Sequence, residues 1–391
     1  MLQEKSGLKR NAMLAFLAFN LLLGTAFTQT ESVLHNFVAN GTDGYAPHEG
    51  LAVDKKGNFY GTTYEGGASN YGTVFKVTPK GAETVLYSFA GGPDGAYPYF
   101  SGALVLDTAG NLYGTTWAGG ANGYGTVFKL TPAGVETVLH SFAYDGTDGD
   151  YPHAGLVLDK TGNLYGSTYY GGANGFGTVF KVTPAGTETV LYSFKGGTDG
   201  CYPYNAGLVI GKKAALYGTT SGCGASGAGT VFKVTPTGTE TVLHSFANNG
   251  TDGVHPYAGL VLEKTTGNFY GTTHDGGASN NGTVFMVTPT GTETVLHSFV
   301  NDGADGLNPY AGLILDKTGN LYGTTYSGGA SNNGTVFELT PSGTEIVLHS
   351  FGVDPDGALP TASLVLGKKG ILYGTTTAGG TNYGTVFKVV P

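Results

Sequence analysis

The sequence is poor in charged residues, in arginine and in cysteine. Charged side chains make up 12% of its 391 residues, about half of the usual share in soluble domains. Arg10 is the only arginine. If the chain is cleaved after Arg10, it has no guanidinium group to bind a carboxylate or phosphate through two parallel hydrogen bonds. Anionic ligands are therefore disfavoured.

The first 26 residues have the pattern of a secretory signal peptide. Lys5, Lys9 and Arg10 precede the apolar run 12–23, and small residues follow at 24–26. The run is too short for a membrane span, which needs about 20 residues. We expect residues 1–26 to be removed and 27–391 to form one secreted or extracytoplasmic domain, in the periplasm or at the cell surface. An uncleaved anchor is the lesser alternative.

The charge balance narrows the range of partners. The chain carries a net charge of −9, and residues 1–26 hold three basic residues and one acidic residue. The mature chain is thus more acidic still, which disfavours nucleic acid as a partner. We expect no membrane span in the mature chain, no cofactor and a monomeric state.

Cys201 and Cys223 are the only cysteines. In a secreted chain a disulfide is the natural interpretation. The alternative is two free thiols, and the absence of nearby histidine in the sequence argues against a metal site at this pair.

The chain is rich in glycine and in repeats. It has 69 glycines, and one phrase, Tyr-Gly-Thr-Thr followed by Gly-Thr-Val-Phe, recurs seven times with minor changes. Its tyrosines are spaced about 52 residues apart, which indicates a repeat architecture: Tyr60, Tyr113, Tyr165, Tyr217, Tyr270, Tyr322 and Tyr373.

Each repeat divides into four short strands. In the sixth repeat we expect strands at 312–316, 321–325, 335–339 and 345–351, separated by turns rich in proline and glycine. The apolar runs do not alternate with polar residues, which suits sheets covered on both faces. The glycine of Tyr-Gly-Thr-Thr would leave room for a large side chain of a neighbouring sheet.

The two ends of the chain are out of phase with the repeat. Residues 32–37 copy the last strand of a repeat, whereas the chain ends at Pro391, before that strand. A ring in which the N-terminal strand completes the last sheet accounts for both ends, because closure leaves no open edge. We therefore predict an all-β, seven-bladed β-propeller of four-stranded blades. A β-solenoid is the alternative, but neither end resembles a cap.

Strand direction places two sets of loops on one face, the top face. These are the loops between blades and the loops between second and third strands. They carry most of the acidic residues and, of the lysines, only Lys195. Such a face would attract cations and basic partners.

The candidate ligand-binding residues vary between repeats on this face. One set follows the loop proline and lies near the central channel: His48, Tyr99, His153, Tyr204, Tyr257, Tyr310 and Thr361. A second set follows Tyr-Gly-Thr-Thr: Tyr64, Trp117, Tyr169, Ser221, His274, Tyr326 and Thr377. Aromatic rings with polar tips suit stacking on sugars or cationic ligands. Trp117, flanked by Tyr64 and Tyr169, is our first choice of contact residue. The alternative is that these rings only pack between blades.

Acid–base chemistry and metal binding have fewer candidates. An enzyme would use His48 with Glu49, or His255 with His274 and Asp275. Asp145, Asp148 and Asp150 could bind calcium, but an aspartate before glycine is more simply a turn former. The histidine of the fourth strand is replaced by Tyr87 and Tyr192 in two repeats, which favours packing over ligation. No nucleophile elbow, zinc helix motif or phosphate loop is present.

The repeated phrases resemble a known family. Tyr-Gly-Thr-Thr, Gly-Gly-Ala, Gly-Thr-Val-Phe-Lys-Val-Thr-Pro and Thr-Val-Leu-His-Ser-Phe resemble the Gloeo/Verruco (GloVer) tandem repeats of exported bacterial proteins, over all of the chain after the signal. That resemblance implies export and no particular activity. Gly155 to Asp159 and Gly162 to Tyr165 look like the NHL and streptogramin-lyase propellers, which implies the propeller rather than the solenoid.

The sequence thus predicts a secreted binding module for a neutral glycan or a cationic ligand of the cell surface. A lyase or hydrolase on the same face is one alternative, although an enzyme is the weaker hypothesis because a propeller fold implies no activity. A purely structural envelope protein is the other.

Overall fold

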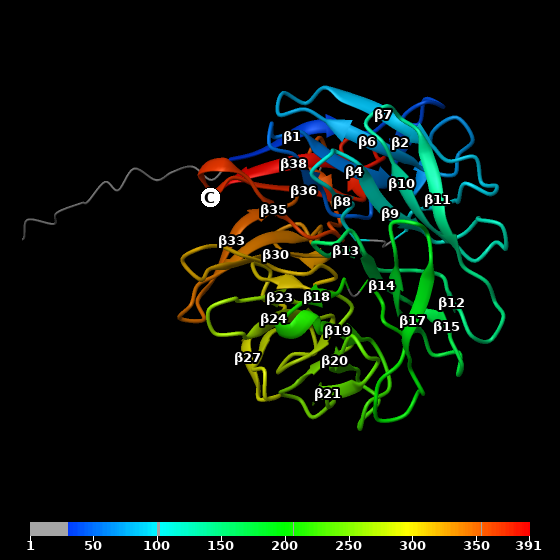
Figure 1. Ribbon diagram of the computed structural model, residues 1–391. Coiled ribbons are helices and arrows are strands. Elements are labelled where there is room, and N and C mark those ends of the chain that lie inside the picture. The colour runs from blue at the N-terminus through cyan, green and yellow to red at the C-terminus, as the bar shows by residue number, and fades with distance from the viewer. Residues whose placement is uncertain (1–29, 100–101, 206, 353) are drawn as a thin grey trace, which may run out of the picture.

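The computed structural model describes residues 30–99, 102–205, 207–352 and 354–391. It is a ring of seven four-stranded antiparallel sheets, or blades (Figure 1). The predicted signal peptide, 1–26, lies outside the described residues. The seven-bladed propeller is confirmed, and its closure excludes the solenoid.

Each blade runs from a short inner strand at the axis to a long outer strand at the rim. The inner strands of blades 1 to 7 are β3 (Ala52–Val53), β8 (Val105–Leu106), β13 (Val157–Leu158), β18 (Val209–Ile210), β23 (Val261–Leu262), β29 (Ile314–Leu315) and β35 (Val365–Leu366). The second strands are β4 (Phe59–Thr63), β9 (Leu112–Thr116), β14 (Leu164–Thr168), β19 (Leu216–Thr220), β24 (Phe269–Thr273), β30 (Leu321–Thr325) and β36 (Leu372–Thr376).

The third strands carry the Thr-Val-Phe phrase and lie in the middle of each blade. They are β6 (Thr73–Val77), β10 (Thr126–Leu130), β16 (Thr178–Val182), β20 (Thr230–Val234), β26 (Thr283–Val287), β32 (Thr335–Leu339) and β38 (Thr385–Val390). The outer strands are β7 (Glu83–Ser88), β11 (Glu136–Ser141), β17 (Glu188–Ser193), β21 (Glu240–Ser245), β27 (Glu293–Ser298), β33 (Glu345–Ser350) and, for blade 7, β1 (Thr30–Asn36).

The N-terminal strand closes the ring as predicted. β1 pairs antiparallel with the C-terminal strand β38, from Thr30 opposite Val390 to Asn36 opposite Thr385. Figure 1 shows this blue strand beside the red end of the chain. The pairing covers the edge of β38 and gives blade 7 its fourth strand, so the two ends of the chain hold the ring together.

Short extra strands tie the top-face loops to one another. In five blades, the loop before the blade forms a two-stranded pair with the loop between that blade's second and third strands. The pairs are β2 (Gly44–Tyr45) with β5 (Glu65–Gly66), β12 (Gly149–Asp150) with β15 (Tyr170–Gly171), β22 (Gly253–Val254) with β25 (Asp275–Gly276), β28 (Gly306–Leu307) with β31 (Ser327–Gly328), and β34 (Gly357–Ala358) with β37 (Ala378–Gly379). Blades 2 and 4 have single bridges there. On the opposite, bottom face, short 3-10 turns follow two inner strands, η1 (Lys212–Ala214) and η2 (Lys368–Gly370).

Phenylalanines pack the blades against one another. Phe75 of the third strand is fully buried, and Phe37, which ends the outer strand of the preceding blade, meets it edge to face at 5.0 Å between ring centroids. The other six junctions repeat this contact at 5.0–5.4 Å. Edge-to-face pairs of this kind add about 0.5–1.5 kcal/mol each beyond the area that they bury.

The glycine of Tyr-Gly-Thr-Thr has a different neighbour from the one expected. A Cβ atom on Gly61 would lie 2.6 Å from Cζ of Phe75, and Gly61 pairs directly with Phe75 in the same sheet. The expectation of a side chain from a neighbouring blade is therefore wrong. The ring lies over the glycine because the two residues face each other across β4 and β6.

Candidate functional site

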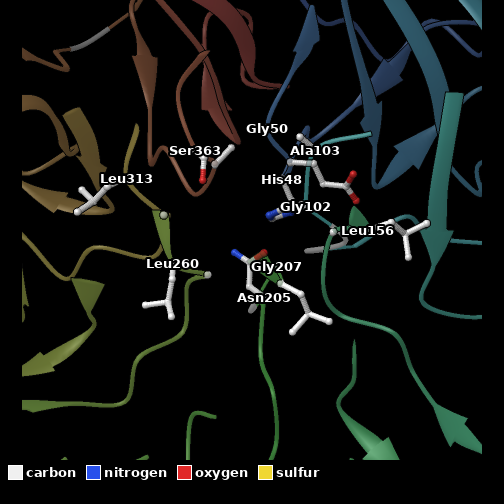
Figure 2. A pocket seen from close by; sticks show the side chains of 16 residues that line it. His48, Gly50, Gly102, Ala103, Leu156, Asn205, Gly207, Leu260, Leu313 and Ser363 are labelled. Atoms are coloured by element: carbon white, nitrogen blue, oxygen red, sulfur yellow. The ribbon is translucent and has the colours of Figure 1, made fainter. Parts of the chain in front are cut away.

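Small residues line the central channel. Just before the inner strands, the chain carries Gly50, Ala103, Gly155, Gly207, Gly259, Gly312 and Ser363 around a cavity of about 220 Å³ (Figure 2). Neighbouring backbones approach closely there, since a Cβ on Gly259 would lie 2.4 Å from the carbonyl oxygen of Gly207. The channel is thus narrow, and among the described residues His48, Glu49, Asn205 and Ser363 are the polar side chains that line it.

An almost continuous aromatic ring surrounds the top of this channel. His48, Tyr99, His153, Tyr204, Tyr257 and Tyr310 come from successive blades, and the ring centroids of neighbours lie 4.9–5.9 Å apart. Thr361 of blade 7 closes the circle because its hydroxyl donates a hydrogen bond to the carbonyl of His48 at 3.2 Å. The structure thus brings together the whole first set of predicted residues.

The second set packs on the outside of this ring. Tyr64 contacts Tyr99 at 4.7 Å, Tyr169 contacts His153 at 5.1 Å, and Tyr326 contacts Tyr310 at 5.2 Å between centroids. Most of these side chains are partly exposed. These rings therefore pack against rings of the first set and remain partly exposed to solvent.

A cavity opens in the top face where this second set is interrupted. Its volume is about 350 Å³, and it is lined by Tyr169, Tyr202, Tyr204, Ser221, Gly222, His255, Tyr257 and Tyr310. Ser221 occupies the position that is Tyr64 or Trp117 in other blades, and its hydroxyl donates to the carbonyl of Tyr202 at 2.8 Å. The missing ring at Ser221 leaves the space. We call this space the top-face cavity.

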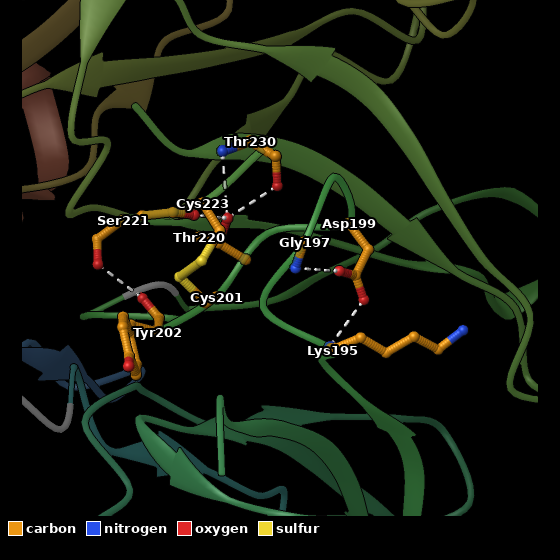
Figure 3. Close-up of a disulfide and its surroundings, with 10 residues drawn as sticks. Lys195, Gly197, Asp199, Cys201, Tyr202, Thr220, Ser221, Cys223 and Thr230 are labelled. Carbon is orange, nitrogen blue, oxygen red and sulfur yellow. Dashed lines mark hydrogen bonds between the residues drawn. A yellow bond between two sulfur atoms is a disulfide. The ribbon is translucent and has the colours of Figure 1, made fainter. Parts of the chain in front are cut away.

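A disulfide borders the top-face cavity. Cys201 and Cys223 are bonded, with their Cα atoms 5.3 Å apart, and Figure 3 shows Tyr202 and Ser221 next to them. The bond joins the loop before blade 4 to the loop between β19 and β20, where five of the other blades use paired strands. It therefore fixes the two loops that supply Tyr202, Ser221 and Gly222 to the cavity.

Trp117 lies outside this cavity. Its ring contacts Tyr151 at 5.2 Å, His153 at 6.4 Å and Tyr99 at 6.5 Å. It is partly exposed in the same aromatic surface, on blade 2. The top-face cavity lies over blades 3 to 6, with Tyr169 among its lining residues.

The structure brings His255, His274 and Asp275 together beside the cavity. Nδ1 of His255 lies 2.8 Å from one oxygen of Asp275, and Nδ1 of His274 lies 2.9 Å from the other. Burial alone would raise the pKa of Asp275, but its contacts with the two histidines hold that pKa well below its usual range. Asp275 is thus an ionised carboxylate between two imidazoles.

In the other predicted acid–base pair, Glu49 is buried and His48 is partly buried. Glu49 is 2% exposed and accepts a hydrogen bond from the hydroxyl of Thr62. His48 lies in ring contact with Tyr64 and Tyr99, and burial lowers its pKa to about 4. Burial lowers the pKa of His153 to about 4 as well, so both imidazoles are neutral parts of the aromatic ring at neutral pH.

The aspartates before each blade close the loops between blades. One oxygen of Asp148 accepts hydrogen bonds from the backbone N–H of Ala143 at 3.0 Å and from Nε2 of His140 at 3.0 Å. Asp94 does the same with Ala90 and with the hydroxyl of Tyr87. Histidine and tyrosine exchange at this position because both donate to the aspartate.

The three aspartates considered for calcium have separate roles. Asp145 accepts backbone hydrogen bonds from Thr147 and Asp148 within its own turn, and Asp148 is held by His140 as described. Asp150 is 3% exposed in β12. Burial and the charge of Asp148 raise the pKa of Asp150 to about 6.

Three top-face tyrosines were not predicted as site residues from the sequence. Tyr97, Tyr151 and Tyr202 directly precede the loop proline and have positive φ, between 51° and 58°. His255 holds the same position, with φ of 55°, and was predicted only as an acid–base candidate. Residues before proline normally adopt extended backbone, so no turn rule pointed to them. The available signal was their variability, because the same position is Ala46, Asn308 or Leu359 in other repeats.

Comparisons with known proteins agree with the fold. The family model for the Gloeobacter/Verrucomicrobia repeat matches residues 18–210 and 204–391. Virginiamycin B lyase from Staphylococcus aureus is similar in structure, with 13% identity, a TM-score of 0.62, and coverage of 93% of this chain and 99% of that chain. At this identity the likeness shows the fold alone.

A second solved structure is of the same kind. The extracellular domain of the putative hybrid two-component system BT3049 from B. thetaiotaomicron has 12% identity and a TM-score of 0.60, with coverage of 93% of this chain and 41% of that one. A search of curated proteins finds no sequence match. Within the described residues, no helix is both long and apolar enough to cross a membrane.

Proposed function

Since the chain belongs to the Gloeobacter/Verrucomicrobia repeat family and closes as a seven-bladed propeller, we propose that it is a binding module whose ligand occupies the top-face cavity. The observation that carries this proposal is the cavity itself, in which Tyr169, Tyr204, Tyr257 and Tyr310 surround the gap at Ser221. Aromatic walls with a few polar groups are typical of small-molecule sites.

The chemistry of the walls favours a neutral or cationic ligand with a flat face, such as a sugar ring. Tyrosine rings stack on such faces, and their hydroxyl groups hydrogen-bond to polar substituents. No lysine is among the lining residues, and Asp275 adds a negative charge next to His255. An anionic ligand would meet this charge without a counterion.

A binding experiment with matched variants tests the proposal. A glycan array, followed by calorimetry on any hit, would compare the wild type with Ser221→Trp, which fills the gap, and Tyr257→Ala, which removes a wall. Tyr144→Ala is the control, because Tyr144 is 72% exposed and does not line the cavity.

We expect at least a tenfold loss of affinity for both cavity variants, as stacking contributes about 1–3 kcal/mol per ring, and no loss for Tyr144→Ala. Equal binding by wild type and Ser221→Trp would rule out the cavity as the site. The same outcome combined with weaker binding by Trp117→Ala would move the site to blade 2.

A hydrolase or lyase is the second candidate, and the His255–Asp275–His274 cluster favours it. An ionised carboxylate that orients an imidazole at the edge of a cavity is a common arrangement for general acid–base catalysis. If the protein is such an enzyme, we expect turnover that His255→Gln or Asp275→Asn abolishes. A broad screen of glycosides, lactones and esters without turnover would exclude this candidate in favour of the binding module.

The disulfide supports an extracytoplasmic location, since such bonds persist in oxidising compartments. This location also agrees with the signal peptide expected at residues 1–26. Detection of the chain in the periplasmic or culture fraction, shortened at its N-terminus, would test both points.

A further inference from the structure

A second type of polar cluster recurs on the outer rim, away from the top-face cavity. At each junction the first glutamate of an outer strand lies against the loop aspartate of the preceding blade and against the histidine or tyrosine of the preceding outer strand. Between blades 2 and 3 these residues are Glu188, Asp148 and His140.

The donor atoms of four such clusters are close enough to share one ion. In each, one imidazole nitrogen and two carboxylate oxygens all lie within 4.8 Å of one another. The clusters are His140 with Asp148 and Glu188, His35 with Asp43 and Glu83, His244 with Asp252 and Glu293, and His349 with Asp356 and Glu31. Tetrahedral Zn²⁺ with bonds of about 2.0–2.2 Å separates its ligand atoms by about 3.4 Å.

In each of these clusters, one carboxylate oxygen of the glutamate makes no hydrogen bond to any described residue. Oε1 of Glu188 is inaccessible to solvent and makes no hydrogen bond within the described residues, and the same holds for Glu31, Glu83 and Glu293. A buried carboxylate oxygen without a hydrogen bond is costly. Burial and the charge of Asp148 raise the pKa of Glu188 to about 7. The negative charge of Glu188 is therefore poorly stabilised beside that of Asp148.

Two of the clusters border cavities on the rim. His140, Asp148 and Glu188 line a space of about 490 Å³ together with Asp145 and Thr147, and Glu31 and Asp356 line another of about 490 Å³. The side chains of His140 and Asp148 are 19% and 11% exposed. An ion can therefore reach these donors from solvent and keep a water molecule as its fourth ligand.

We propose that these rim clusters are binding sites for a divalent transition-metal ion of the Zn²⁺ type, with His140, Asp148 and Glu188 as the best-formed site. Two carboxylates balance the charge of the ion, and the histidine selects against calcium, which prefers oxygen ligands. The imidazole binds through Nε2 with its proton on Nδ1, so the ion replaces the Nε2–H donor to Asp148. Each bound ion joins the outer strands of two neighbouring blades.

The repeat contains natural controls. Among the described residues, the other three junctions lack such a cluster. At two of them the histidine position is tyrosine, and the hydroxyls of Tyr87 and Tyr192 donate to Asp94 and Asp199 at 2.9 and 2.7 Å. The third has His297 next to Asp305 but is not among the four clusters. The glutamates of the two tyrosine junctions, Glu136 and Glu240, also carry inaccessible oxygens without hydrogen bonds. They differ from the proposed sites mainly in the nitrogen ligand.

The test uses the full chain, treated with EDTA and dialysed. Calorimetric titration with ZnCl₂ should give saturable binding of about four equivalents, one for each cluster. When Co²⁺ is used in place of Zn²⁺, its visible absorption bands should indicate nitrogen and oxygen ligands. Glu188→Gln and His140→Gln should each remove one equivalent. Glu240→Gln, at the Tyr192 junction, should remove none, and Tyr192→His should add one.

Thermal unfolding of each variant without metal checks that the fold is retained. If one of Glu188→Gln and His140→Gln does not fold, the other variant tests the site. Absence of saturable Zn²⁺ binding would overturn the proposal, as would equal losses in Glu188→Gln and Glu240→Gln. If Ca²⁺ displaces Zn²⁺ from the sites at equal concentration, the proposal that the histidine selects against calcium is overturned. Ligand binding in the top-face cavity does not depend on these outcomes.

Discussion

At the scale of single residues, the protein depends on glycines that leave space for phenylalanine rings. Gly61 lies opposite Phe75, and any Cβ atom would meet the ring at 2.6 Å. The same arrangement recurs in every blade, for example at Gly166 with Phe180 and Gly323 with Phe337. The glycine therefore belongs to the core rather than to a turn.

Replacing Gly61 with alanine should destabilise the fold. The new methyl group overlaps a fully buried ring that closely packed neighbours hold in place, which typically costs about 1–3 kcal/mol. Urea unfolding followed by circular dichroism measures the change. Gly92→Ala is the matched control, because a Cβ there meets nothing within 4 Å, and equal stability of the two variants would contradict the explanation.

The buried histidines of the aromatic ring predict a loss of stability in acid. Burial lowers the folded-state pKa of His153 from 6.5 to about 4, so between these values the unfolded chain binds a proton that the folded chain does not. Stability from this residue is complete above pH 6.5 and falls as the pH drops toward 4, by up to about 3 kcal/mol.

His153→Phe should remove this part of the pH dependence. The measurement is the free energy of unfolding at about pH 8 and about pH 4.5. Tyr169→Phe, which keeps His153 and its ring contact, should retain the wild-type slope. A slope unchanged in His153→Phe would show that the imidazole is protonated in the folded state.

At the scale of strands and loops, the sequence predicted some features better than others. The strands expected at 321–325 and 335–339 are confirmed as β30 and β32, because turns with proline and glycine mark their ends. The inner strand expected at 312–316 is only Ile314–Leu315. Gly312 and Leu313 before it line the channel, where Gly312 lies close to Gly259 and, within the described residues, pairs with no strand.

The top-face cavity was only partly predictable, for a physical reason. Tyr169, Tyr204, Tyr257 and Tyr310 were visible because they vary at fixed positions in the repeat. The contribution of Tyr202 depends on its positive φ of 58°, which the rule for residues before proline does not allow for. The gap at Ser221 was visible in the sequence, but a missing side chain becomes a cavity only if nothing else moves into it.

At the scale of the whole molecule, closure depends on one strand from the start of the chain. β1 supplies the outer strand of blade 7 and, through Phe37, the contact with Phe75 of blade 1. Without it, the edge of β38 is open and the junction between blades 7 and 1 loses its phenylalanine.

Deleting residues 30–37 should therefore abolish the monomeric fold, and moving them to the C-terminus should restore it. Val390 lies opposite Thr30, so a Thr-Pro-Ser-Gly turn, as at 340–343, can connect the two strands. Size-exclusion chromatography with light scattering, together with near-UV circular dichroism, distinguishes the forms. A folded monomer from the deleted chain would show that the ring does not need β1.

The gap at Ser221 has a consequence for how such a protein can be engineered. The position after Tyr-Gly-Thr-Thr holds a ring in five blades and a small hydroxyl side chain, Ser221 or Thr377, in the other two. The fold therefore accepts both large and small side chains there. Replacing a large side chain at this position with a small one in another blade should open a second compartment without redesign of the scaffold.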